Sequence, residues 1–266
     1  MDKITTTKLL EMKKNGDKIV MLTAYDYSMA KLLNEAGIDV LLVGDSLGMV
    51  KRGYENTLAV TVEDVVLYTK AVKAGNSRAL LIADMPFMSF EVSPQEAVRN
   101  AGKMVKNGGA EAVKIEGGEE VIDRIKAIIA AKIPVMGHIG LTPQAINQLG
   151  GFKVQGRNDR SAAKLIITAK KLEKAGVFAL VLEAVPAALA AKLSATLSIP
   201  VIGIGAGAEC DGQVLVVDDI LGLFAEFRPK FVKRYANLKE LILKAARDYK
   251  REVKEKIFPS EEYSYK

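Results

Sequence analysis

The sequence has one cysteine, one histidine and no tryptophan among its 266 residues. A lone cysteine, Cys210, cannot form a disulfide within the chain, and this favours a reducing compartment, so we expect a cytoplasmic protein. The same scarcity excludes a zinc or copper site built from several His and Cys ligands. A metal site in this chain would have to use mainly oxygen ligands.

Long apolar runs are also missing. No stretch of 18 apolar residues occurs, so we predict no transmembrane helix. The opening residues, MDKITTTKLLEMKKNGDK, lack the apolar core of a secretory signal, so none is expected. The net charge is +6, but the lysines alternate with acidic residues at helical spacing, as in LKELILKAARDYKREVKEK. We therefore expect no nucleic-acid binding, although a basic funnel for an anionic substrate stays open.

The chain does contain a regular alternation of short apolar runs and longer amphipathic segments. The runs occupy residues 18–24, 39–45, 79–86, 112–118, 134–140, 178–185, 200–207 and 213–219. Continuous apolar strands that alternate with helices indicate a parallel sheet covered on both faces. Eight such units predict a closed (β/α)8 TIM barrel, with an open doubly wound sheet as the alternative. We expect one domain over residues 1–266, with an N-terminal helical extension and a C-terminal helix and tail.

Acidic residues stand at the ends of several predicted strands. Asp45, Asp84, Glu116 and Glu183 end the second, third, fourth and sixth runs. In a parallel barrel all the carboxyl ends of the strands meet at one rim, where active sites lie, so these side chains should converge. Crowded carboxylates must be protonated or must hold a cation. Oxygen ligands favour Mg²⁺, with Mn²⁺ possible, although any single acid could instead cap a helix or pair with a lysine.

Two basic side chains are expected at the same rim. His138 follows the fifth run, and Lys114 stands two residues before Glu116, so both side chains of that strand face the same side. A lysine inside a barrel needs an anionic partner, which could be Glu116 or a substrate carboxylate. The glycine-rich loop GIGAGAECDGQ resembles phosphate-binding loops only weakly, and Cys210 within it is expected to be a bystander thiol.

Longer motifs carry a family resemblance. They occur in the order TAYDYSMAKLLNEAGIDVLLVGDSLGMVKRGYENT, ADMPFMSF, VKIEGG, GHIGLTPQ, GGFKVQGR, LEAVP and IPVIGIGAGAECDGQVLV, and they extend from residue 23 to about residue 235. Together they resemble the ketopantoate hydroxymethyltransferase family. The resemblance implies an enzyme of pantothenate synthesis that transfers a hydroxymethyl group from 5,10-methylenetetrahydrofolate to 3-methyl-2-oxobutanoate. The product would be 2-dehydropantoate (ketopantoate), formed through a Mg-stabilised enolate.

The resemblance also implies roles for particular residues. The family's metal ligands correspond to Asp45, Asp84 and Glu116, and its catalytic base corresponds to Glu183. Substrate contacts correspond to Ser46, Lys114 and His138, together with Asp45 and Asp84 among the metal ligands. Family members are cytoplasmic homo-oligomers, commonly decamers, so the same assembly is expected here.

Three residues depart from the family pattern: Tyr68, Phe152 and Asp218. None of them replaces a predicted ligand or the predicted base. One alternative function is another metal–enolate barrel enzyme, such as a lyase or mutase acting on phosphoenolpyruvate or isocitrate, although those enzymes usually place a reactive cysteine in a lid loop. Another is a catalytically silent scaffold that binds a metal or an oxo acid.

Overall fold

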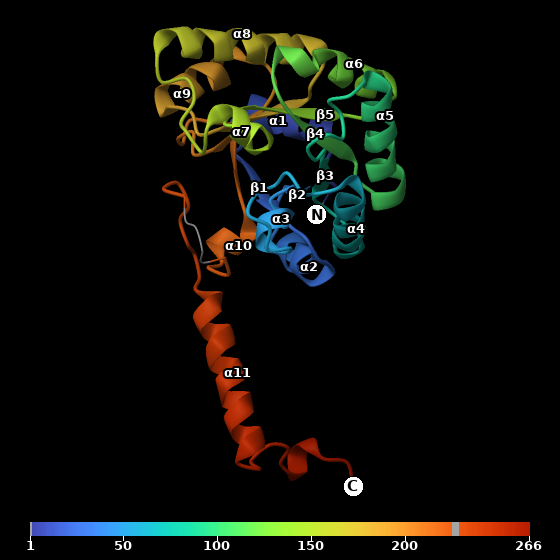
Figure 1. Cartoon of the computed structure of the whole chain (residues 1–266), viewed down its shortest axis with the longest axis vertical. Helices are drawn as coiled ribbons and strands as arrows, with labels where there is room; N and C mark the ends of the chain where they lie inside the picture. Colours follow the sequence, from blue (N-terminus) through green and yellow to red (C-terminus); the bar gives the residue numbers. More distant parts are fainter. Residues whose placement is uncertain (1, 225–228) are drawn as a thin grey trace. The chain divides into compact units, whose positions relative to one another are not determined.

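The computed structural model describes residues 2–224 and 229–266, and the chain forms two compact units. The first unit, residues 1–216, contains the sheet and the helices that surround it, and the second comprises residues 217–266 (Figure 1). The expectation of one domain over the whole chain stays a prediction. No helix within the described residues is long and apolar enough to cross a membrane.

Within the first unit, eight strands form a closed parallel barrel in the order β1 to β8, and β8 pairs with β1. This confirms the predicted (β/α)8 fold class, and each strand lies within or overlaps one predicted run. The strands are β1 Ile19–Thr23, β2 Val40–Val43, β3 Leu80–Asp84, β4 Ala112–Glu116, β5 Val135–Gly140, β6 Ala179–Glu183, β7 Val201–Ile204 and β8 Gly212–Leu215.

The helices follow local sequence signals at both ends. Ser93 caps α5, with Pro94 as the first helical residue and the Glu96 N–H bonded to Ser93 Oγ at 3.1 Å. Gly176 ends α8 in the left-handed conformation, with φ 103°. The α-helices of the first unit are α1 Thr6–Asn15, α2 Tyr27–Glu35, α3 Leu47–Val50, α4 Val62–Gly75, α5 Pro94–Lys103, α6 Ile122–Ala130, α7 Ile146–Leu149, α8 Asp159–Ala175 and α9 Ala187–Thr196.

Short non-α turns complete the first unit, and the second unit is mainly helical. The π-helix η1 spans Met104–Gly108, and the 3-10 helices η2 and η3 span Glu119–Val121 and Pro143–Ala145. The second unit contains α10 Val217–Ile220, α11 Leu238–Lys254 and the 3-10 helix η4 Glu261–Tyr263.

The barrel interior is apolar toward the amino ends of the strands and polar toward their carboxyl ends. On β3, Leu80 and Ile82 belong to the hydrophobic core cluster, and Asp84 is the next residue with the same alternation. On β4 the same alternation runs from Ala112 in the cluster to Lys114 and then to Glu116. The side chains of Asp84, Lys114 and Glu116 therefore face the barrel interior, like the apolar side chains that precede them on the same strands.

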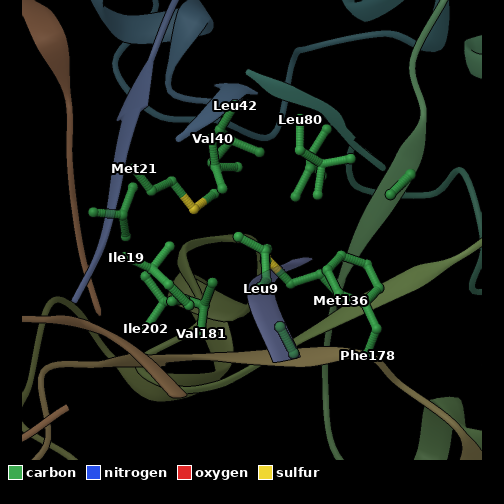
Figure 2. Close-up of a cluster of buried hydrophobic side chains, with 14 of the residues drawn as sticks. Leu9, Ile19, Met21, Val40, Leu42, Leu80, Met136, Phe178, Val181 and Ile202 are labelled. Atoms are coloured by element: carbon green, nitrogen blue, oxygen red, sulfur yellow. The ribbon is translucent and has the colours of Figure 1, made fainter. Parts of the chain in front are cut away.

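Helix α1 closes the apolar end of the barrel. Leu9 is fully buried and lies in the core cluster among strand residues such as Ile19 and Met136 (Figure 2). Lys13 on the same helix forms an ion pair with Asp211, with its Nζ 2.6 Å from Oδ2. This arrangement excludes water from the amino end and leaves the carboxyl end for chemistry.

We expect Leu9→Ala to lower the free energy of unfolding by about 2–5 kcal/mol, because it removes buried methyl groups and leaves a cavity. Urea denaturation followed by circular dichroism measures this change. Leu32→Ala is the matched control, since Leu32 is 60% exposed on α2. Equal, small effects of the two substitutions would contradict the packing role of Leu9.

Candidate active site

Strand register brings the predicted rim residues together. Asp84 pairs with Lys114 across β3 and β4, and Glu116 pairs with His138 across β4 and β5. Glu183 is the register partner of Gly140 across β5 and β6. Parallel pairing therefore sets these polar side chains side by side around one arc of the barrel, at the carboxyl ends of the strands.

Three buried carboxylates form a compact cluster. Asp45 lies in the turn after β2, and its backbone N–H donates to Asp84 Oδ2 at 3.3 Å. One carboxylate oxygen from each of Asp45, Asp84 and Glu116 lies within 4.8 Å of the other two, and all three residues are buried. Hard oxygen donors at this spacing fit a divalent cation such as Mg²⁺ or Mn²⁺. The structure thus brings together the three predicted ligands.

Lys114 pairs with two of these acids. Its Nζ lies 2.8 Å from Asp84 Oδ1 and 3.4 Å from Glu116 Oε1. Burial alone would lower the pKa of Lys114, but the negative charges of Asp84 and Glu116 outweigh burial and raise it. The lysine is therefore a charged ammonium inside the barrel. From the sequence we expected Glu116 or a substrate carboxylate as the partner; Glu116 is one partner, but Asp84, which was not expected, lies nearer.

His138 joins the cluster to Glu183. Its Nδ1 lies 3.2 Å from Glu116 Oε1, and its Nε2 lies 3.2 Å from Glu183 Oε2. Burial and the nearby Lys114 charge would lower the pKa of His138, but the charge of Glu116 and the contacts with Glu116 and Glu183 raise it to about 9. At neutral pH the ring is therefore an imidazolium that lies between two carboxylates, and its Nδ1 also lies 3.1 Å from Lys114 Nζ.

Burial tends to raise the pKa of all three acids of the cluster, but their charged neighbours make the final shifts differ. Burial raises the pKa of Asp45, and the charges of Asp84 and Glu116 raise it further; burial is also the main cause of the raised pKa of Asp84. Burial opposes ionisation of Glu116 too, but Lys114 and His138 lower its pKa to about 2. Four carboxylates including Glu183 face two basic groups, so full ionisation would leave two negative charges uncompensated. A bound divalent cation would match that excess.

Ser46 and Glu183 are the more accessible members of this arrangement. The Glu183 side chain is 13% exposed, whereas those of Asp84, Lys114 and Glu116 are 2–4% exposed. Ser46 is half-buried, and its Oγ lies 2.8 Å from the hydroxyl of Tyr25. These two side chains are the ones that an entering molecule could touch first.

The backbone beside Glu183 depends on a glycine. Gly140 has φ 97°, in the left-handed region that favours glycine, and a Cβ there would collide with the carbonyl oxygen of Glu183. The same carbonyl accepts a hydrogen bond from the Leu141 N–H at 2.9 Å. Any larger residue at position 140 would displace Glu183.

Two residues that contact the site were missed at the sequence level. Tyr25 is buried, and its hydroxyl lies 2.8 Å from Ser46 Oγ. Gln144 binds two of the acids: its Nε2 lies 3.0 Å from Asp45 Oδ2, and its backbone N–H donates to Glu116 Oε2 at 3.1 Å. Both residues stand inside the quoted motifs, but neither residue type signals a ligand by itself.

The remaining predicted residues lie outside these contacts. Cys210 is buried, and burial, followed by the charge of Asp211, raises the pKa of its thiol to about 11, so the thiol is neutral at physiological pH. Of the departures from the family pattern, Phe152 is 50% exposed and Asp218 is buried in α10.

The fold and the site define a (β/α)8-barrel enzyme with an acidic cluster, a lysine and a histidine at the carboxyl ends of its strands. The family model described as "Ketopantoate hydroxymethyltransferase" matches residues 3–261. A protein of Clostridium kluyveri named "3-methyl-2-oxobutanoate hydroxymethyltransferase" is 57% identical over 266 residues, which cover 100% of this chain and 95% of that protein. A protein of Syntrophus aciditrophicus with the same name is 55% identical, covering 99% of this chain and 97% of that protein.

Solved structures of much lower identity share the fold. A phosphonopyruvate hydrolase complex with oxalate and Mg²⁺ aligns with a TM-score of 0.62 at 14% identity, over 99% of this chain and 93% of the other. A 2,3-dimethylmalate lyase of the PEP mutase/isocitrate lyase superfamily aligns with a TM-score of 0.59 at 15% identity, over 98% of this chain and 91% of the other. At such identities the likeness establishes the barrel alone.

The family is shown by the relatives that match over the full length of the chain, and not by the distant solved structures. This chain belongs to the ketopantoate hydroxymethyltransferase family, as the motifs predicted, and it is therefore a transferase of hydroxymethyl groups in the pantothenate pathway.

Proposed function

We propose that this enzyme transfers a hydroxymethyl group from 5,10-methylenetetrahydrofolate to 3-methyl-2-oxobutanoate and forms 2-dehydropantoate. The relatives named for the 2-oxo acid support the choice of acceptor. The observation that carries the proposal is the position of Glu183, an accessible carboxylate that contacts His138 at the edge of a buried cluster able to hold a cation.

The cation site would be formed by Asp45, Asp84 and Glu116, with Mg²⁺ as the first choice and Mn²⁺ as the second. Their buried carboxylates, two of them with raised pKa values, support this assignment because a divalent cation would stabilise the ionised forms. When bound, the cation supplies Lewis-acid chemistry that draws electron density from a 2-oxo acid and makes its C3 proton more acidic.

Glu183 is the general base in this proposal. Its carboxylate accepts the C3 proton, and the electron pair of the C–H bond becomes part of an enolate. His138 Nε2 lies 3.2 Å from Glu183 Oε2 and would hold this carboxylate by their ion pair, and Gly140 leaves space for the Glu183 backbone. Ser46, whose Oγ lies 2.8 Å from the Tyr25 hydroxyl, would bind an oxygen of the substrate.

Lys114 and His138 provide the positive charge of the site. Both are buried and both have raised pKa values, so they stay protonated where negative charge develops on the oxo acid. Donors that are fixed before reaction stabilise such charge more strongly than mobile water. Lys114 would also attract the substrate carboxylate, which accords with the sequence expectation of an anionic partner.

Carbon–carbon bond formation completes the reaction. The enolate carbon forms a bond to the methylene carbon carried by the folate, the two C–N bonds to that carbon break, and water supplies the hydroxyl oxygen. One proton from water and the proton accepted by Glu183 pass to the two nitrogen atoms, and tetrahydrofolate leaves. The lyase alternative draws less support, because the one cysteine is buried with a protonated thiol rather than placed in an accessible lid loop.

Removal of divalent cations should abolish activity, because the charge excess of the cluster would be left uncompensated. Ketopantoate formation is measured in EDTA and after addition of excess Mg²⁺, which should restore the rate. Asp45→Asn should resist restoration while keeping the circular dichroism spectrum of the parent. Full activity in saturating EDTA would exclude the cation role.

Glu183→Gln should slow deuterium exchange at C3 of 3-methyl-2-oxobutanoate by about 10²–10⁴-fold, because an amide cannot accept the proton. NMR of the oxo acid in D2O without folate measures the exchange, and calorimetry measures its binding, which should persist. Glu209→Gln is a matched control, since Glu209 is an exposed residue of the loop after β7. Exchange at the parental rate in Glu183→Gln would assign the base to another residue.

We also propose a cytoplasmic homo-oligomer. Helix α11 has no buried residue, and its apolar side chains at positions 238, 241, 242, 245, 249 and 253 repeat at helical spacing. A second copy of the chain could cover that row. Light scattering at micromolar concentration should give a multiple of 28.7 kDa. A monomeric mass would contradict the proposal.

A further inference from the structure

One glutamine contacts the segments that carry all three acids of the cluster. The Nε2 of Gln144 donates to Asp45 Oδ2 and to the backbone carbonyl of Met85, each at 3.0 Å. Its backbone N–H donates to Glu116 Oε2 at 3.1 Å. Met85 directly follows Asp84, so this single residue ties together the turn after β2 and the ends of β3 and β4.

The orientation of the Gln144 amide follows from its partners. Both groups near Nε2 are acceptors, a carboxylate and a carbonyl, so the nitrogen and not the oxygen must face them. The residue is 7% exposed and follows Pro143 in η3, in the segment after β5. A buried side chain that is held by two hydrogen bonds has little freedom to move.

We propose that Gln144 is a positioning residue of the cation site. Its side chain holds Asp45 against the end of β3, and its backbone holds Glu116, so the spacing of the three carboxylates depends on it. Neutral donors suit this position because they stabilise carboxylates without adding a positive charge that would compete with a cation. Such outer contacts usually change metal affinity by about 10–100-fold when they are removed.

The amide oxygen of Gln144 could contribute to the cation site in a second way. Gln144 Oε1 is buried and accepts no hydrogen bond from the described residues. A buried acceptor of this kind is stabilised when a donor reaches it. The atom is therefore available to a hydroxyl group or water molecule that enters together with the cation.

This inference rests on the proposed cation site, and its test separates the two. Mn²⁺ binding to the purified full-length protein is measured by electron paramagnetic resonance for the parent, Gln144→Leu and Gln144→Met. Leucine and methionine each remove the donor at similar size, and neither adds a charge that would itself attract or repel the cation. The backbone contact to Glu116 persists in both variants. Gln148→Leu is the matched control, because Gln148 is exposed on α7.

We expect both Gln144 variants to bind Mn²⁺ about 10–100-fold more weakly than the parent. Gln148→Leu should bind like the parent, and excess Mn²⁺ should restore much of the lost turnover number of Gln144→Leu. A purely packing role would lower the melting temperature of the metal-free protein and spare the affinity. Should Gln144→Leu fail to fold, Gln144→Met decides the result alone. Parental affinity in a folded variant overturns this inference, whereas absence of Mn²⁺ binding to the parent overturns the cation site itself.

Discussion

The burial of ionised groups inside a barrel is the constraint on which this structure depends. Lys114 forms ion pairs with Asp84 and Glu116. His138 lies between Glu116 and Glu183, so each basic group is shared between two acids. Isolated charges at such depth would be strongly destabilising, and sharing offsets that cost only in part. The imbalance that remains, an excess of acid, is the physical reason why the cluster could hold a divalent cation.

The rest of the barrel supports this arrangement. Apolar side chains fill its amino half, and Leu9 of α1 closes that end, so water can approach the polar groups only from the carboxyl side (Figure 2). Exposure is graded in the same direction, from the deeply buried Asp84 to the partly accessible Glu183. The gradient separates the charges proposed to bind and polarise a substrate from the carboxylate proposed to exchange a proton with it.

The comparison with distant barrels shows how fold and activity separate. Phosphonopyruvate hydrolase and 2,3-dimethylmalate lyase share the architecture at 14–15% identity, while relatives at 55–57% identity share the family. A parallel barrel presents the ends of eight strands to one rim, so different side chains there can support different reactions without a change of fold. For this chain we propose a carboxylate, and not the buried Cys210 thiol, as the group that exchanges the proton.

The sequence by itself determined the eight strands and the clustering of Asp45, Asp84 and Glu116, because apolar runs predict buried strands and parallel strands share one rim. It also placed His138 and Glu183 at that rim. Only the tertiary structure decided which acid Lys114 prefers, since that depends on the register between β3 and β4. The contacts of Gln144 and Tyr25 likewise needed three dimensions, because each joins segments far apart in the chain through hydrogen bonds that residue type alone does not reveal.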